Sequence, residues 1–220
     1  LAEYSPDGTK VSYIFENNIY IKDITSGKIT QVTSDGKRNE IINGTTDWVY
    51  EEEFGITKGY AWSPDGNHIG YLKFNENDVK EFSMTYYKDL YPELYTFKYP
   101  KAGEDNSKVT VNMYSIATGK SEKVDLGQYE YIPRLKWSPI ENKLIVQTLN
   151  RHQNELKYHV IKVSNDNIAA STIYTETSET YIDIDDNLLI LNDGKTILRT
   201  SEKNGYNHIY KLCFDGQMTQ

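Results

Sequence analysis

The feature that most constrains the fold is a turn that recurs along the chain. Ser-Pro-Asp-Gly occurs at residues 5–8 and again at 63–66, each time after an aromatic residue and before an alternating apolar stretch. A weaker copy begins at Ser138-Pro139, and a fourth keeps only Asp193-Gly194. Pro and Asp-Gly favour tight turns, and apolar residues at every second position are typical of β-strands. Each copy therefore predicts a strand, a tight turn and a second strand.

A further strand, turn and strand follow each copy of this turn. They begin at segments 18–23, 111–116, 158–163 and 208–212, and the turn after the third segment is expected at 164–166. The repeated unit is then a group of antiparallel strands, which is typical of one blade of a β-propeller. A β-sandwich is the competing all-β architecture, but it gives no reason for a repeated unit. The 19 tyrosines also favour strands.

We therefore expect an all-β chain in which residues 1–220 form part of one β-propeller, with about four to five blades of antiparallel strands. So few units, and a sequence that starts and stops inside a unit, indicate a portion of a larger propeller. Two insertions interrupt the repeat. One contains residues 47–54, and the other is a long excursion near 75–105, which we expect to form an extended arm.

Charge and hydropathy exclude two classes of partner. The formal net charge is −8 and no Lys/Arg-rich cluster occurs, so binding to nucleic acid is not expected. The longest apolar runs, such as 188–191, are too short to span a membrane. The single Cys213 cannot form a disulfide within the chain.

The sequence motifs of known catalytic sites are missing from the chain. No Gly-x-Ser-x-Gly nucleophile elbow and no Gly-rich phosphate loop occur, and the four histidines lack the spacing of a zinc site. We expect His68 on the surface, and His159 and His208 packed within strands. The acidic turn at 183–186 lacks the spacing of a calcium loop and is expected to be solvated. No catalytic residue, metal site or cofactor is predicted in this chain.

The remaining candidate for a site is the acidic motif Asp47-Trp48-Val49-Tyr50-Glu51-Glu52-Glu53-Phe54. A run of glutamates is most simply a solvated face. Here Trp48, Tyr50 and Phe54 flank the run and can anchor it, and a fixed carboxylate cluster can bind a metal, a basic side chain or a free ammonium group. Two carboxylates can together accept three charge-assisted hydrogen bonds from one ammonium group.

This motif resembles the glutamate motif of the dipeptidyl peptidase IV family, in the prolyl oligopeptidase class of serine peptidases. The resemblance runs in the same order along essentially the whole chain and includes Tyr99-Pro100-Lys101-Ala102-Gly103 and the segment 201–210. It implies a propeller that caps an α/β-hydrolase domain, with substrate reaching a Ser-Asp-His triad between them. No triad is present in these residues, so the chain alone is expected to be inactive.

The resemblance also implies roles for individual residues. Glu52 and Glu53 would hold the free amino terminus of a peptide substrate, with Glu51, Trp48 and Tyr50 in support on a short helical insertion. The enzyme would release amino-terminal dipeptides of the X-Pro or X-Ala type. Family members act outside the cytoplasm, so a periplasmic, cell-surface or secreted location is implied.

The second insertion resembles the arm that family members use for dimer contacts. Tyr86, Tyr87, Tyr95 and Tyr99 are the implied contact residues of a homodimer. From composition alone, a hairpin that folds back on its own blade is an equal alternative. At the level of function, the alternative is a non-catalytic propeller that serves as a scaffold or binding module. A prolyl oligopeptidase or acylaminoacyl peptidase is disfavoured, because neither requires a free substrate amine.

Overall fold

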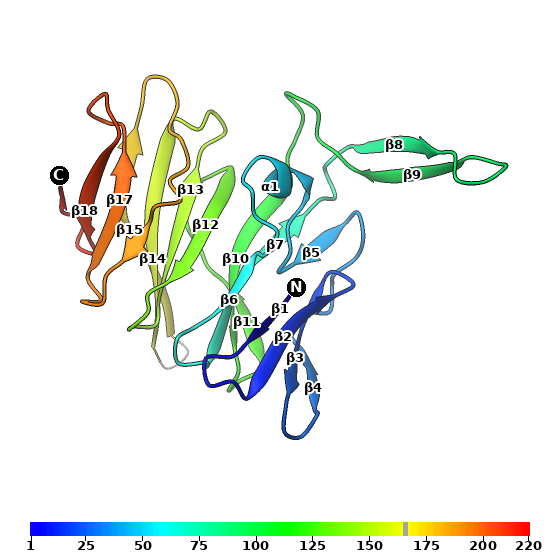
Figure 1. Cartoon of the computed structure of the whole chain (residues 1–220), viewed down its shortest axis with the longest axis horizontal. Coiled ribbons are helices and arrows are strands. Elements are labelled where there is room, and N and C mark those ends of the chain that lie inside the picture. The colour runs from blue at the N-terminus through cyan, green and yellow to red at the C-terminus, as the bar shows by residue number, and fades with distance from the viewer. Residues whose placement is uncertain (165–166) are drawn as a thin grey trace.

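The computed structural model describes residues 1–164 and 167–220, and within them the strands form four antiparallel sheets and one separate hairpin. The sheets follow one another across the molecule in chain order (Figure 1). We call them the first to fourth blades. The chain is therefore nearly all β, as predicted, and the number of blades agrees with the predicted range. Among the described residues, no helix has the length and apolar character needed to cross a membrane.

Three blades are simple four-stranded meanders. The first contains β1 (Ala2–Tyr4), β2 (Lys10–Phe15), β3 (Asn18–Asp23) and β4 (Ile29–Gln31). The third contains β12 (Tyr131–Trp137), β13 (Lys143–Leu149), β14 (Glu155–Ser164) and β15 (Asn167–Thr177). The fourth contains β16 (Leu189–Ile190), β17 (Thr196–Ser201), β18 (His208–Cys213) and β19 (Met218–Thr219). Most of the turn predicted at 164–166 lies outside the described residues.

The second blade carries both insertions. Its strands are β5 (Ile41–Asn43), β6 (Tyr60–Trp62), β7 (His68–Asn75), β10 (Lys108–Ser115) and β11 (Lys120–Lys123), and both β5 and β6 pair with β7. The helix α1 (Trp48–Glu52) lies between β5 and β6. The hairpin of β8 (Glu81–Tyr86) and β9 (Glu93–Lys98) lies between β7 and β10 and projects from the blades as an arm (Figure 1).

The repeated turn has a physical cause in its Ser and Asp side chains. Ser5 Oγ donates to Asp7 Oδ1, and Ser63 Oγ donates to Asp65 Oδ1, each at 2.6 Å. Each carboxylate also accepts the backbone N–H two residues later, at 3.0 Å. The Gly that follows has φ +70 in both turns, a conformation that glycine adopts without strain. The same four-residue sequence therefore produces the same turn at the start of two blades.

Apolar side chains on successive blades pack against one another. Leu72 and Val111 of the second blade share a buried cluster with Leu144 and Val146 of the third blade. Similar clusters join the first blade to the second and the third to the fourth. Gly70 allows a close approach between the second and third blades, because a Cβ at this position would lie 2.8 Å from Leu144 Cδ2. Burial between sheets therefore fixes the blades in a stack.

The histidine predictions have different outcomes. His159 is buried and its ring nitrogens lie 2.8 Å from Thr148 Oγ1 and 3.0 Å from Thr172 Oγ1, so it is packed within its sheet as predicted. The surface position predicted for His68 is wrong, because only 7% of this residue is exposed. His68 opens β7, and the turn that precedes it folds back so that Ser63 Oγ accepts its backbone N–H at 2.9 Å.

Candidate functional site

The helix α1 begins at Asp47, which serves as its N-cap. Asp47 Oδ1 accepts the backbone N–H of Tyr50 at 3.0 Å, which satisfies one of the free donors of the first turn. Its other carboxylate oxygen accepts the hydroxyl of Ser107, just before β10, at 2.6 Å. Only 6% of Asp47 is exposed, and this burial raises the pKa of its carboxyl. The start of the helix is thereby fixed to the second blade.

One face of the helix is anchored in the core. Tyr50 and Phe54 are 2% and 5% exposed, and the ring of Tyr50 packs edge-on against Phe74 at 4.8 Å. The Tyr50 hydroxyl accepts the backbone N–H of Ile132, on β12 of the third blade, at 2.8 Å. Burial raises the pKa of Tyr50 well above its ordinary value. Tyr50 and Phe54 therefore anchor the insertion, as the sequence predicts.

Trp48 anchors the helix in a different way. It is half-buried, and its ring lies 4.4 Å from the ring of Tyr99, at the base of the arm. Tyr99 in turn contacts Phe82 of β8 at 5.6 Å. The two insertions of the second blade therefore meet through aromatic side chains.

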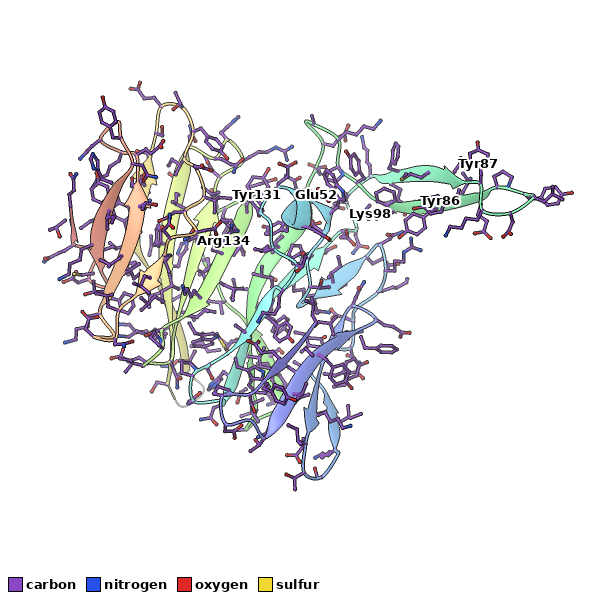
Figure 2. All side chains as sticks on the ribbon, viewed as in Figure 1. Glu52, Tyr86, Tyr87, Lys98, Tyr131 and Arg134 are labelled. Carbon is purple, nitrogen blue, oxygen red and sulfur yellow. The ribbon has the colours of Figure 1, made fainter. Side chains whose placement is uncertain are left out.

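The three glutamates lie on the solvent side of the insertion. Glu51, Glu52 and Glu53 are all exposed, and no other described side chain donates a hydrogen bond to their carboxylates or forms an ion pair with them. Figure 2 shows Glu52 on the short helix between the third blade and the arm. Three adjacent carboxylates without an ion pair among the described residues can attract and bind a cation, although Lys101 and Arg151 line a cavity beside Glu53.

This cavity of about 870 Å³ opens beside Glu53, whereas Glu51 and Glu52 do not line it. Glu53, Phe54 and Tyr131 form part of its wall, and the rings of Phe54 and Tyr131 are 5.3 Å apart. Burial raises the pKa of Tyr131, and the charges of Glu130 and Glu53 act in the same direction. Further aromatic side chains come from the arm and its base, and polar ones from the loop between β13 and β14 and from the connection between the third and fourth blades. These are Phe82, Phe97 and Tyr99, and Arg151, Gln153 and Tyr181.

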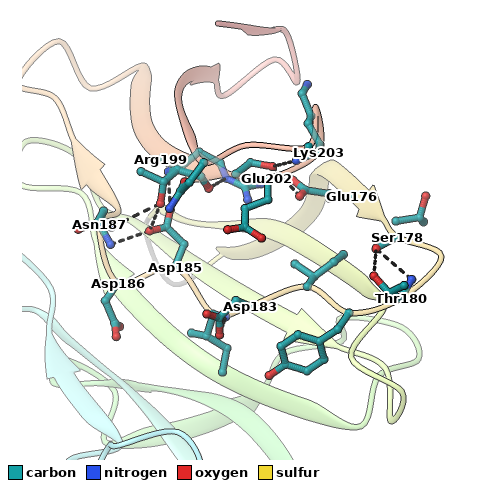
Figure 3. A pocket seen from close by; sticks show the side chains of 18 of the residues that line it. Glu176, Ser178, Thr180, Asp183, Asp185, Asp186, Asn187, Arg199, Glu202 and Lys203 are labelled. Atoms are coloured by element: carbon teal, nitrogen blue, oxygen red, sulfur yellow. Dashed lines mark hydrogen bonds and ion pairs between the residues drawn. The ribbon is translucent and has the colours of Figure 1, made fainter.

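The acidic turn at 183–186 belongs to a second cavity, of about 590 Å³, between the third and fourth blades (Figure 3). The prediction of a solvated turn is wrong for Asp185, which is buried. Its carboxylate accepts the backbone N–H and the hydroxyl of Thr200, at 2.6 and 2.7 Å, and so attaches the turn to β17. In the described part of the chain, no group of His, Cys, Asp and Glu residues could hold a metal ion.

Arg199 is a charged residue that sequence reasoning missed. It is 2% exposed, and its guanidinium lies 2.7 Å from the carboxylate of Glu176 at the edge of the second cavity. The guanidinium also lies over the rings of Tyr158 and Tyr174, at 4.9 and 5.7 Å. No sequence signal pointed to this pair, because its members lie on different blades. The ion pair of Arg199 with Glu176 of β15 joins the third and fourth blades.

The arm exposes most of its aromatic residues. Tyr87 is 80% exposed and Tyr95 is 41% exposed, while Tyr86 is half-buried and stacks on Tyr95 at 5.4 Å. Tyr99 lies at the base of the arm rather than on its projecting part. Sequence reasoning did not select three exposed residues near the tip, which are Leu90, Tyr91 and Leu94. The hairpin projects from its blade instead of folding back on it (Figure 2).

Comparison with known proteins gives a consistent family match. All of residues 1–220 match the family described as the dipeptidyl peptidase IV (DPP IV) N-terminal region. A probable dipeptidyl-aminopeptidase B of Podospora anserina is 33% identical over 182 residues, which cover 74% of this chain and 19% of the relative. Dipeptidyl aminopeptidase B of Saccharomyces cerevisiae is 43% identical over 127 residues, covering 55% of this chain and 15% of the relative.

A solved structure agrees with these matches. The crystal structure of Porphyromonas gingivalis dipeptidyl peptidase 4 superposes with a TM-score of 0.93 and 38% sequence identity, covering 100% of this chain and 32% of that one. This chain therefore spans about a third of that structure, and 15% to 19% of the two curated relatives above.

Proposed function

The chain belongs to the dipeptidyl peptidase IV family, as its N-terminal region, and we propose that it is part of the propeller domain of a peptidase that releases amino-terminal dipeptides. In this proposal a hydrolase domain elsewhere in the full-length protein supplies a serine-type catalytic triad. The propeller controls access to that domain and selects the substrate. The observation that carries the proposal is the exposed run of glutamates on an anchored helix beside a cavity.

Glu52 and Glu53 bind the free amino terminus of the substrate in this proposal. Their carboxylates have no described donor of their own, so they are available for the three N–H groups of an ammonium. Hydrogen bonds to charged groups contribute about 1.5–3 kcal/mol each. A fixed amine site at one end of the substrate pocket also sets how many residues reach the catalytic serine, which explains the release of dipeptides. Glu51, Trp48 and Tyr50 support the pair.

The remaining parts of the proposal concern substrate preference, location and assembly. We propose dipeptides of the X-Pro or X-Ala type and a location outside the cytoplasm, both from family membership. We also propose a homodimer in which the arm contributes Tyr86, Tyr87 and Tyr95. The exposed aromatic residues of the arm support this, because large apolar side chains gathered on a projecting element are typical of association surfaces.

The double variant Glu52→Ala/Glu53→Ala in the full-length protein tests the amine site. We expect kcat/KM on dipeptide substrates with a free amino terminus to fall at least about 100-fold, the effect of losing two charge-assisted contacts. Glu122→Ala is the matched control, because it removes an exposed carboxylate from β11 of the same blade that does not line the cavity, and its kcat/KM should change less than twofold. Full activity of the double variant would refute the proposal. Equal activity of the wild-type protein on amino-terminally acetylated and free substrates would refute it as well.

A further inference from the structure

The position of Glu52 and Glu53 depends on contacts made by the backbone around them. The helix that carries them has only five residues, too few for stability without tertiary contacts. The glutamate side chains have no described polar partners that could hold them in place. Whatever fixes the two ends of the insertion therefore also fixes the carboxylates.

The two ends of the insertion are held by different blades. Asp47 ties the beginning to the second blade through Ser107, as described above. At the other end, the chain turns at Gly55, which has φ +65. The carbonyl of Phe54, directly after Glu53, accepts a hydrogen bond from Nη1 of Arg134 at 2.8 Å. Arg134 lies on β12 of the third blade, beside the helix that carries Glu52 (Figure 2).

Arg134 is itself oriented by two further contacts. Its Nη1 also donates to the carbonyl of Pro133 at 2.7 Å, and its Nε donates to Asp186 Oδ1 at 2.5 Å. Asp186 lies in the loop that leads into the fourth blade (Figure 3). The hydrogen bond from Arg134 lowers the pKa of the Asp186 carboxyl. The planar guanidinium can hold these partners at once, whereas a lysine ammonium on a flexible stem cannot fix the same geometry.

We propose that Arg134 is a positioning residue for the amine site, and that Asp186 acts through it. The inference rests on the proposed function, because it assigns a role toward the pair Glu52 and Glu53. Arg134 connects three parts of the molecule: the glutamate insertion, the first strand of the third blade, and the loop before the fourth blade. Substrate affinity then depends on a residue that need not touch the substrate.

The direction in which substrate binding changes when Arg134 is removed distinguishes a positioning role from a purely electrostatic one. Arg134 is a cation that contacts the residue next to Glu53. If only its charge mattered, its removal would strengthen the binding of a substrate ammonium. If it positions the carboxylates, its removal weakens binding, and a lysine that keeps the charge does not restore it.

The experiment compares Arg134→Met and Arg134→Lys in the full-length protein, with free-amino-terminus dipeptide substrates. We expect KM to rise about tenfold in both variants, with kcat within about threefold, because the lost interaction serves binding. Lys136→Met is the matched control. Lys136 lies two residues along the same strand and its Nζ donates to the carbonyl of Leu188 at 2.7 Å, so it ties β12 to the same connection without contacting the helix. Its KM should change less than twofold.

Several outcomes would overturn the inference. An unchanged or lower KM in Arg134→Met, or a normal KM in Arg134→Lys, shows that Arg134 does not position the site. Asp186→Asn covers the case in which Arg134→Met fails to fold, because the Asp186 side chain is 72% exposed. For Asp186→Asn we expect KM to rise about threefold. An unchanged KM in this variant also overturns the inference. If Glu52→Ala/Glu53→Ala collapses activity while the Arg134 variants match the control, only the positioning role fails. Full activity of that double variant means that the proposed function fails.

Discussion

The two insertions of the second blade are both rich in aromatic residues, but one buries them and the other exposes them. In the α1 insertion, Tyr50 and Phe54 are 2% and 5% exposed. In the arm, Tyr87 and Tyr91 are each 80% exposed. Burial of apolar area stabilises a segment against its own blade, whereas exposed apolar area leaves that free energy available for a partner. The first insertion, residues 47–54, is therefore packed against its blades and is called the platform below, whereas the second leaves its apolar area uncovered in this chain.

The insertions also differ in the environment of their charged groups. Two carboxyl groups are buried where the insertions leave the blade, at 6% exposure each: Asp47 is the N-cap of α1, and Glu76 directly follows β7 at the base of the arm. Burial raises the pKa of Glu76 to about 7, the charge of Asp47 acts in the same direction, and Lys98 opposes it. On the arm, Glu81 and Glu93 are exposed. The buried base of the two insertions thus carries an electrostatic cost that the exposed part of the arm does not.

The largest expected effect tests the anchoring of the platform. Tyr50→Ala should destabilise the second and third blades by about 3–5 kcal/mol, the usual cost of removing a buried aromatic side chain. It also leaves the backbone N–H of Ile132 without its acceptor. Hydrogen exchange of the β7 and β12 amides in the full-length protein measures this loss. A change below 1 kcal/mol would mean that the insertion is attached elsewhere, and that the contrast with the arm is wrong.

Sequence accounted for much of the fold because the relevant signals are local. The Ser-Pro-Asp-Gly turn closes through its own side chains, so the start of a blade can be predicted from four residues. The aromatic anchors of α1 could be identified because they stand next to the glutamates in the chain. These predictions needed no knowledge of distant contacts.

The parts that sequence did not predict depend on residues far apart in the chain. Arg134 and Phe54 are 80 residues apart, and Arg134 and Asp186 are 52 apart. Nothing near Arg134 distinguishes it from other basic residues on strands. Asp185 is buried with one donor from its own turn, the Asn187 N–H, and two from Thr200 of β17, 15 residues away. Such contacts arise when blades pack, and a single sequence records no trace of the pairing.

The second prediction concerns the buried carboxyl at the base of the arm. The folded pKa of Glu76 is raised to about 7 from its ordinary 4.5, so the folded state holds a proton more tightly than the unfolded state. The protonated carboxyl of Glu76 makes its full contribution to stability below pH 4.5. This contribution is lost as the pH rises through 7, because the buried carboxyl must then ionise. Glu76→Gln should therefore stabilise the protein at pH 8 by about 2–3 kcal/mol relative to its effect at pH 5.

Glu81→Gln is the matched control for this pH dependence. Glu81 is exposed on the arm, and its carboxylate lies 3.9 Å from Nζ of Lys98. The charge of Lys98 also opposes the rise in the pKa of Glu76. Hydrogen exchange of the β7 amides at pH 5 and pH 8 measures both variants. An equal effect of Glu76→Gln on stability at the two pH values would show that the buried carboxyl carries no electrostatic cost.

A smaller effect is expected at the cap of the platform helix. Ser107→Ala removes the hydroxyl that donates to the buried Asp47 carboxylate, and should cost about 1–2 kcal/mol. Ser83→Ala is its counterpart on the arm, where the hydroxyl lies 2.9 Å from Thr96 Oγ1 in an exposed pair. That variant should cost less than about 0.5 kcal/mol. Hydrogen exchange measures the loss of stability in both variants. Equal losses would show that burial does not determine how much these hydrogen bonds contribute to stability.

The smallest effect on stability is expected near the tip of the arm. Leu90→Ser/Tyr91→Ser replaces residues that are 89% and 80% exposed, so the free energy of unfolding at high dilution should change by less than about 0.5 kcal/mol. If the arm binds a second copy, the wild-type protein gains stability with concentration because association favours the folded state, and the variant loses this gain. Thermal unfolding at two protein concentrations separates the cases. A loss of stability that persists at high dilution would mean that the tip packs against its own chain, which would make the arm a second platform.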